Sequence, residues 1–246
     1  LNLDNNQLTT ISQEAFNRNL QLRHISMQSN HLTLSNPDLQ RLAAENQFDL
    51  ISPFQNLENL RTLNLRNNSI MILFRDWRIS LLKLEMLDLS YNNITKLEDT
   101  ETQYLSKENL FVNLTHNQIH NIIFTHVQIL DIKREIKMDL NHNPVHCDCS
   151  LLHFTQFLRG EKAQPISKLL QLQAESLYCS EPNKLQGQLV SAVDPRELLC
   201  PYDLKESQHK KCPLGCECWV RSLDAALLIN CSQGNMTKIP ALPRLD

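Results

Sequence analysis

A leucine–asparagine signature recurs six times in the first 145 residues, and it constrains the fold more than any other feature of the chain. In each copy one residue separates two apolar residues, and an asparagine follows after two more positions. The first apolar residues of the copies lie 24, 38, 24, 25 and 26 residues apart, at Leu1, Ile25, Leu63, Leu87, Val112 and Met138. Such a period indicates a stack of similar structural units.

All intervals but one match the period of roughly 20–29 residues of the leucine-rich repeat, which the signature resembles. The alternating apolar pair predicts a short strand with one buried face. A single copy cannot bury that face alone, so neighbouring copies must stack. We therefore expect an α/β leucine-rich repeat solenoid over residues 1–145, with a parallel β-sheet on its concave face.

The asparagine of each copy is predicted to turn into the solenoid, where its amide can hydrogen-bond the backbone of adjacent coils. An unpaired buried backbone group costs about 1–3 kcal/mol. A surface turn is the alternative role, but all six copies keep the asparagine at the same offset. The predicted ladder consists of Asn6, Asn30, Asn68, Asn92, Asn117 and Asn143.

The 38-residue interval predicts an insertion near residues 33–59. Within it, Asn36-Pro37-Asp38 has the pattern of a helix start with proline in the first turn. We expect an extra helical segment on the flank or convex side, with one apolar face formed by Leu39, Leu42 and Ala43. A tolerated insertion and a partner contact are both open as its role.

The eight cysteines follow the repeats in two sets, which are Cys147, Cys149, Cys179 and Cys200, then Cys212, Cys216, Cys218 and Cys231. An even number in two tight groups indicates disulfides and an oxidising compartment. Spacing alone leaves three pairings open for four cysteines. Because the last coil of an array exposes its apolar interior, the first set is well placed to form a cap.

Two helices are expected in this first cap. One covers residues 151–159, with Ser150 as its N-cap and Gly160 as its stop. A second short helix is expected to start at Asp194-Pro195. The apolar residues that should point inward from them are Phe154, Phe157, Leu158, Leu198 and Leu199.

Five Asn-X-Ser/Thr sequons also favour a secreted or extracellular chain, and N-linked glycans are expected at Asn67, Asn93, Asn113, Asn230 and Asn235. His142 and His146 lie beside Cys147 and Cys149, and histidine with thiolate is a zinc ligand set. Zinc is the weaker interpretation, because His142 occupies an exposed turn position and the sequons indicate that the cysteines are oxidised.

Composition and motifs argue against several functional classes. The net charge of −3 gives no basis for nucleic-acid binding. No run of about 18 apolar residues exists, and the chain starts in mid-pattern at Leu1, so we expect targeting and membrane-anchoring parts outside this segment. All four glycines follow the repeats, and no nucleophile, metal or phosphate-loop motif is present, so we expect neither an enzyme nor a bound cofactor other than glycans.

The cysteine spacings resemble the C-terminal cap of extracellular leucine-rich repeat proteins, followed by the matching N-terminal cap. This resemblance implies a first cap over residues 146–201, a linker over 202–211, and a second cap with the start of a second array over 212–246. It also implies the pairs Cys147–Cys179, Cys149–Cys200, Cys212–Cys218 and Cys216–Cys231.

Two families place such caps side by side, the insect Toll receptors and the Slit guidance proteins. The segments similar to Toll are Cys147-Asp-Cys-Ser-Leu151-Leu-His-Phe154, Tyr178-Cys-Ser-Glu-Pro182-Asn, Cys200-Pro-Tyr-Asp-Leu204, Cys216-Glu-Cys-Trp-Val220-Arg and Ala226-Leu-Leu-Ile-Asn230-Cys-Ser. A Slit-like cap more usually carries tryptophan where His153 stands. A Slit-like secreted or adhesion protein acting in cell guidance is therefore the alternative.

Resemblance to Toll implies a receptor at the cell membrane, with this segment on the extracellular side. It implies a dimeric cystine-knot cytokine of the Spätzle type as ligand and a second receptor chain on activation, in innate immunity and development. The candidate partner contacts on the concave face are Arg23, Gln28, Arg61, Arg66 and Asp88. A glycan on Asn113, between Val112 and Leu114, would block that face locally. The nine histidines also suggest a pH-switch hypothesis.

Overall fold

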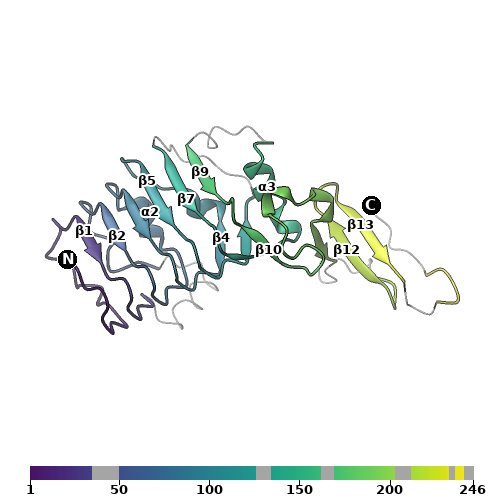
Figure 1. Ribbon diagram of the computed structural model, residues 1–246, viewed down its shortest axis with the longest axis horizontal. Coiled ribbons are helices and arrows are strands. Elements are labelled where there is room, and N and C mark those ends of the chain that lie inside the picture. Colours follow the sequence, from purple (N-terminus) through teal and green to yellow (C-terminus); the bar gives the residue numbers. More distant parts are fainter. Residues whose placement is uncertain (35–49, 126–133, 162–168, 203–211, 233–235, 241–246) are drawn as a thin grey trace.

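The computed structural model describes residues 1–34, 50–125, 134–161, 169–202, 212–232 and 236–240. In this part of the chain the repeats stack side by side into a solenoid, and the two cysteine-rich segments follow at its C-terminal end (Figure 1). The predicted α/β leucine-rich repeat solenoid is thereby confirmed. Among the described residues, no helix combines the length and apolar character that crossing a membrane requires.

The main sheet has six parallel strands in the order β1-β2-β3-β5-β7-β9. They are β1 (His24–Ser26), β2 (Thr62–Asn64), β3 (Met86–Asp88), β5 (Leu110–Asn113), β7 (Ile136–Asp139) and β9 (Leu170–Gln173). The register pairs Ile25 with Leu63, Leu63 with Leu87, Leu87 with Val112, and Val112 with Met138. Equivalent repeat positions therefore lie side by side across the sheet.

The first copy forms no full strand and joins this sheet through a single parallel bridge between Asn2 and Ser26. Strand β9 was not predicted, because its Leu170-X-Leu172 pair is followed by no ladder asparagine. It pairs with β7 from Ile136↔Leu170 to Asp139↔Gln173. The concave sheet thus continues past residue 145 into the segment predicted as the first cap.

Apolar side chains of successive coils form one continuous core, as stacking requires. Leu63, Leu87 and Val112 at the strand centres are fully buried, as are Leu65, Leu89 and Leu114 at the second apolar position. Each coil closes its apolar face against the next, so stability depends on neighbouring repeats rather than on any single one.

The flank and convex side carry shorter elements: α2 (Arg75–Ile79), β4 (Lys96–Glu98), the 3-10 helix η1 (Asp99–Thr102) and β6 (Asn121–Ile123), with β4 and β6 paired in parallel. Trp77 of α2 is buried, and its indole nitrogen donates to Ser52 Oγ at 2.8 Å. Ser52 in turn donates to the Asp76 carboxylate at 2.6 Å. Burial raises the pKa of Asp76, and the hydrogen bonds that Ser52 donates to its carboxylate oppose that shift. The predicted helix at Asn36–Ala43 lies outside the described residues.

Five of the six predicted ladder asparagines are buried, and the residue before each one has a positive φ between 53° and 59°. This left-handed turn directs the asparagine inward. Asn92 shows the pattern, because its Oδ1 accepts from Ile70 N at 2.9 Å while its Nδ2 donates to Leu65 O and Leu89 O at 3.0 Å. Asn6 differs: it is exposed, because the described chain contains no earlier coil to cover it.

The first cap packs its 3-10 helix η2 (Cys149–Leu151) and α3 (Leu152–Leu158) against the end of the solenoid. The predicted N-cap Ser150 is wrong, because Ser150 lies inside η2, whose own N-cap is Asp148 with its carboxylate accepting from Ser150 N at 2.8 Å. The N-cap of α3 is Leu151, which makes no side-chain cap bond. Gly160 has φ of +66° and donates its N–H to Phe157 O, so it ends the helix as predicted.

Strand β8 (Pro144–His146), which precedes η2, pairs in parallel with β10 (Tyr178–Glu181), and the 3-10 helices η4 (Val190–Ala192) and η5 (Pro195–Glu197) follow β10. Asp194 caps η5 by accepting from Arg196 N. The helix predicted from Asp194 is therefore a single 3-10 turn, and only Leu198 of the two expected leucines is fully buried. Leu199 instead starts strand β11 (Leu199–Pro201).

The second cysteine-rich segment contains an antiparallel hairpin of β12 (Glu217–Arg221) and β13 (Ala226–Asn230). This hairpin does not stand alone, because β12 also pairs with β11 of the first cap. The result is a three-stranded sheet in the order β11-β12-β13 that spans both caps. Figure 1 shows the hairpin extending from the C-terminal end of the solenoid.

Candidate binding surface

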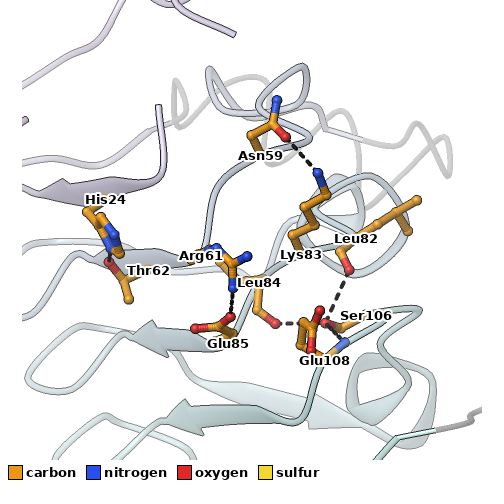
Figure 2. Close-up of polar contacts among 10 residues, drawn as sticks. All are labelled: His24, Asn59, Arg61, Thr62, Leu82, Lys83, Leu84, Glu85, Ser106 and Glu108. Carbon is orange, nitrogen blue, oxygen red and sulfur yellow. Dashed lines mark hydrogen bonds and ion pairs between the residues drawn. The ribbon is translucent and has the colours of Figure 1, made fainter. Parts of the chain in front are cut away.

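The candidate partner contacts lie in cross-strand rows on the concave face, and four of the five make polar side-chain contacts with neighbouring residues. Arg61 forms an ion pair with Glu85 of the next repeat (Figure 2). One position further along, His24 Nδ1 lies 2.8 Å from Thr62 Oγ1. Because β1, β2 and β3 align equivalent positions, each repeat supplies a partner for its neighbour. The concave surface is therefore ordered before any ligand arrives.

Supporting contacts hold the turns that precede these strands. Lys83 Nζ donates to Asn59 Oδ1 at 2.7 Å, and Ser106 Oγ donates to the carbonyl of Leu84 at 2.7 Å (Figure 2). Each bond links one repeat to the next. These bonds fix the strand ends of neighbouring repeats relative to one another. They thereby also hold the row of side chains that contains Arg61.

A second row begins with Gln28, whose Oε1 accepts from Asn64 Nδ2 at 3.3 Å. Arg66 donates to Ser90 Oγ at 2.9 Å, and its guanidinium carbon lies 4.2 Å from the centre of the Tyr91 ring. Asp88 accepts from Ser90 N and Ser90 Oγ at 2.9 and 2.7 Å. Gln28, Arg66 and Asp88 therefore lie in one polar network that crosses β1, β2 and β3.

Arg23 is the exception among the five candidates. Its side chain is exposed and has no hydrogen-bonding or ionic partner in the described part of the chain. Its backbone carbonyl accepts from Arg61 N and Thr62 N, which fixes the position of its Cα on the sheet. Arg23 therefore combines a fixed backbone with a guanidinium group that no described residue contacts through a hydrogen bond or ion pair.

A column of stacked aromatic rings follows the edge of the concave face. The sequence did not lead us to predict this column. Tyr91 stacks on His116 with ring centres 4.3 Å apart, and His116 stacks on His142 at 4.5 Å. Desolvation lowers the pKa of His116, and the neighbouring His142 and Arg66 lower it further, while Asp139 opposes them. The signal was present in the sequence, because these three rings occupy the same offset, directly before a ladder asparagine.

The described sequons lie on the turns and the concave sheet of the solenoid and on the hairpin of the second cap. Asn67 and Asn93 are exposed on the turns beside ladder asparagines, and Asn230 is exposed at the end of β13. Asn113 lies on β5, in register with Asp88 and Asp139, and its Oδ1 accepts from Thr115 N and Thr115 Oγ1. A glycan there would stand on the concave sheet between β3 and β7. Asn235 lies outside the described residues.

All eight cysteines form disulfides, and the pairing is the one that the cap resemblance implies: Cys147–Cys179, Cys149–Cys200, Cys212–Cys218 and Cys216–Cys231. A zinc site at these cysteines would require free thiolates. His142 instead stacks on His116, and His146 lies 3.7 Å from the Glu181 carboxylate. The geometry therefore favours caps closed by disulfides over a metal site.

Comparison with known proteins agrees with this architecture. The leucine rich repeat family model matches residues 51–94. The chain is 41% identical to Protein toll of Drosophila melanogaster over 228 residues, which cover 91% of the chain and 20% of that protein. It is also 26% identical to the CD180 antigen of Mus musculus over 78% of the chain and 26% of that protein. The chain thus spans about a fifth to a quarter of the length of these relatives.

A solved structure extends the match to three dimensions. The Toll chain in the Toll–Spätzle complex of Drosophila superposes on the whole chain with a TM-score of 0.83 and 37% sequence identity, and the match covers 33% of that Toll chain. The similarity therefore includes both the repeats and the two adjoining caps. The chain belongs to the Toll receptor family, as a leucine-rich repeat segment of the ectodomain together with an internal pair of caps.

Proposed function

We propose that this segment forms part of the extracellular portion of a Toll-type receptor that binds a dimeric cystine-knot cytokine of the Spätzle type. In this proposal the receptor lies in the cell membrane, pairs with a second receptor chain on activation, and signals in innate immunity and development. The observation that carries the proposal is the whole-chain similarity to Toll in its complex with Spätzle. Four disulfides fit an extracellular location, where such bonds persist.

The proposed role of the segment is recognition rather than catalysis. Its concave side chains pair with one another across repeats, as Arg61 does with Glu85, and form an ordered polar surface. Such a surface favours specificity and association rate in protein recognition. A glycan on Asn113 would cover β5, so we place the partner contact on β1, β2 and β3, around Arg23.

Binding tests this function directly. The complete receptor ectodomain is immobilised, and a purified Spätzle-type dimer is titrated by surface plasmon resonance, with a Slit-binding receptor ectodomain as the second analyte. We expect saturable binding of the cytokine alone. Absence of cytokine binding refutes the proposal, and binding of the second analyte instead supports the Slit-like alternative.

Charge reversal tests the position of the contact. Arg23→Glu replaces a cation next to β1 that has no partner among the described residues, whereas Arg18→Glu makes the same change at an exposed turn away from the strands. Because charges at an interface mainly change association, we expect several-fold slower cytokine or receptor association for R23E and no change for R18E. Equal rates for both variants would place the contact elsewhere.

A further inference from the structure

We infer that the two caps form one rigid elbow, in which strand β11 of the first cap is the docking edge for strand β12 of the second. The elbow fixes the direction in which the chain continues beyond the second cap. Adjacent caps need not behave in this way, since two disulfide-closed units joined by a linker can rotate freely. This inference rests on contacts between the caps, so it holds whether or not the proposed ligand is correct.

The backbone ladder between the caps carries the inference. Strand β11 pairs with β12 in antiparallel register, with Leu199 opposite Arg221, Cys200 opposite Val220 and Pro201 opposite Trp219. Tyr202 N extends the ladder by donating to Cys218 O at 3.0 Å. The contact therefore runs over four successive residues of each cap and is made by backbone atoms.

The alternation of the ladder explains how a proline fits in β11. Hydrogen-bonded and non-bonded pairs alternate in an antiparallel ladder. Because Tyr202 and Cys218 form a bonded pair, the next bonded pair is Cys200 with Val220, and Pro201 opposite Trp219 falls between them. Pro201 has no N–H to donate, and at this position none is needed.

Each strand of the shared sheet is tied covalently to its own cap. Cys200 of β11 is bonded to Cys149 at the start of η2. Cys218 of β12 is bonded to Cys212, and Cys231, directly after β13, is bonded to Cys216. No disulfide joins the two sets. Sliding β11 along β12 would therefore displace an entire cap, which restrains the register.

A charged side chain, Arg221, lies at the end of the ladder opposite Leu199 of the first cap. Arg221 at the end of β12 donates to both carboxylate oxygens of Asp224, at 2.8 and 2.7 Å, which holds the hairpin turn. This hydrogen-bonded pairing raises the pKa of Arg221, and Asp194 of the first cap adds a smaller electrostatic attraction. A cation of the second cap thus lies within the field of an acid of the first.

Residual dipolar couplings of the ¹⁵N-labelled chain test the rigidity of the elbow. We expect a single alignment tensor to fit the backbone amides of residues 169–202 and 212–232 together. Two tensors of different magnitude or orientation would show that the caps reorient independently, and this result would overturn the inference.

Amide hydrogen exchange tests the ladder itself, because alternate residues of β12 point to different strands. The Val220 N–H faces β11, whereas the Trp219 N–H faces β13. We expect Val220 and Tyr202 to exchange at least 100-fold more slowly than unstructured amides, as Trp219 does. Unprotected Val220 and Tyr202 amides beside a protected Trp219 amide would refute the docking of β12 on β11.

A matched pair of variants separates the backbone contact from side-chain packing. Val220→Pro removes the N–H that faces β11, and Val220→Ala keeps it. We expect V220P to reduce the protection of Tyr202 at least 10-fold and to require two alignment tensors, while V220A retains the wild-type pattern. Unchanged Tyr202 protection in V220P would contradict the inference, and if V220P does not fold, the measurements on the native chain decide alone.

Discussion

Truncation of one ladder asparagine should reveal how the solenoid distributes its buried hydrogen bonds. Asn92 is 3% exposed and accepts from Ile70 N, a backbone donor on a fully buried residue. Its Nδ2 donates to Leu65 O and Leu89 O. Substitution of Asn92 by alanine removes these three bonds and a longer one from Nδ2 to Ser90 O at 3.3 Å, but the consequences for the main partners differ.

The two carbonyl groups keep a second partner. Leu65 O also accepts from Asn68 Nδ2 at 3.0 Å, and Leu89 O also accepts from Asn117 Nδ2 at 2.9 Å. Ile70 N has no such replacement among its described contacts. The main penalty is therefore one buried N–H without an acceptor, which costs about 1–3 kcal/mol.

Loss of packing adds to this penalty, because the void left by the amide is only partly filled. We expect Asn92→Ala to lower the free energy of unfolding by roughly 2–4 kcal/mol. The matched control is Asn6→Ala, since Asn6 is exposed and its Oδ1 accepts from no described donor. A surface substitution of this kind changes stability by about 0.5 kcal/mol or less.

Urea titration of the disulfide-intact protein, followed by circular dichroism, measures both changes. Coincident transitions from far-ultraviolet signal and tryptophan fluorescence establish that a two-state analysis applies. If N92A is as stable as the wild type, or if N6A loses as much stability as N92A, then the ladder does not act by satisfying buried donors of adjacent coils.

Three further outcomes are expected. In NMR titrations the pKa of His116 should lie below its ordinary value of 6.5, and His142→Ala should raise the pKa of His116. The stabilisation from neutral His116 is then present above pH 6.5 and is lost as the pH falls through the folded-state pKa. An unshifted pKa of His116 would refute the stacked arrangement of the rings. Thr115→Ala should remove one N-glycan by mass spectrometry while Thr115→Ser keeps it, and equal masses would show that Asn113 is not modified. Replacing Cys149 and Cys200 by serine should cost about 2–5 kcal/mol of unfolding free energy, and unchanged denaturation would show that the cap needs no bridge.

Local periodicity explains why the sequence predicted the solenoid. The strand centres, the inward asparagines and the tight turns lie within a few residues of one another, so each copy of the signature specifies its own coil. Stacking then follows because Leu63, Leu87 and Val112 cannot be buried by a single repeat. The same reasoning missed β9, because that strand lacks the asparagine and joins the sheet only through its pairing with β7.

The sequence predicted where the candidate surface lies but not which partners its side chains contact. The variable positions between the core leucines place Arg23, Arg61 and Arg66 on the concave face, yet only the three-dimensional register shows that Arg61 pairs with Glu85 and Arg66 with Tyr91. These partners are separated by 24 and 25 residues, and a sequence pattern does not report such pairings. Arg23 is distinguished by the absence of a described partner, which sequence alone cannot show.

The two caps show the same difference between local features, which the sequence predicts, and long-range contacts, which it does not. By itself the sequence determined two cysteine sets, a stacked array and its sealed end, because spacing and composition are local properties of the chain. Only the three-dimensional structure decided that a 3-10 turn capped by Asp148 precedes the helix expected to start after Ser150, and that β11 and β12 join the two caps. Backbone pairing between strands depends on geometry rather than on side-chain identity, and for that reason the residues of β11 and β12 carry no signal that they meet.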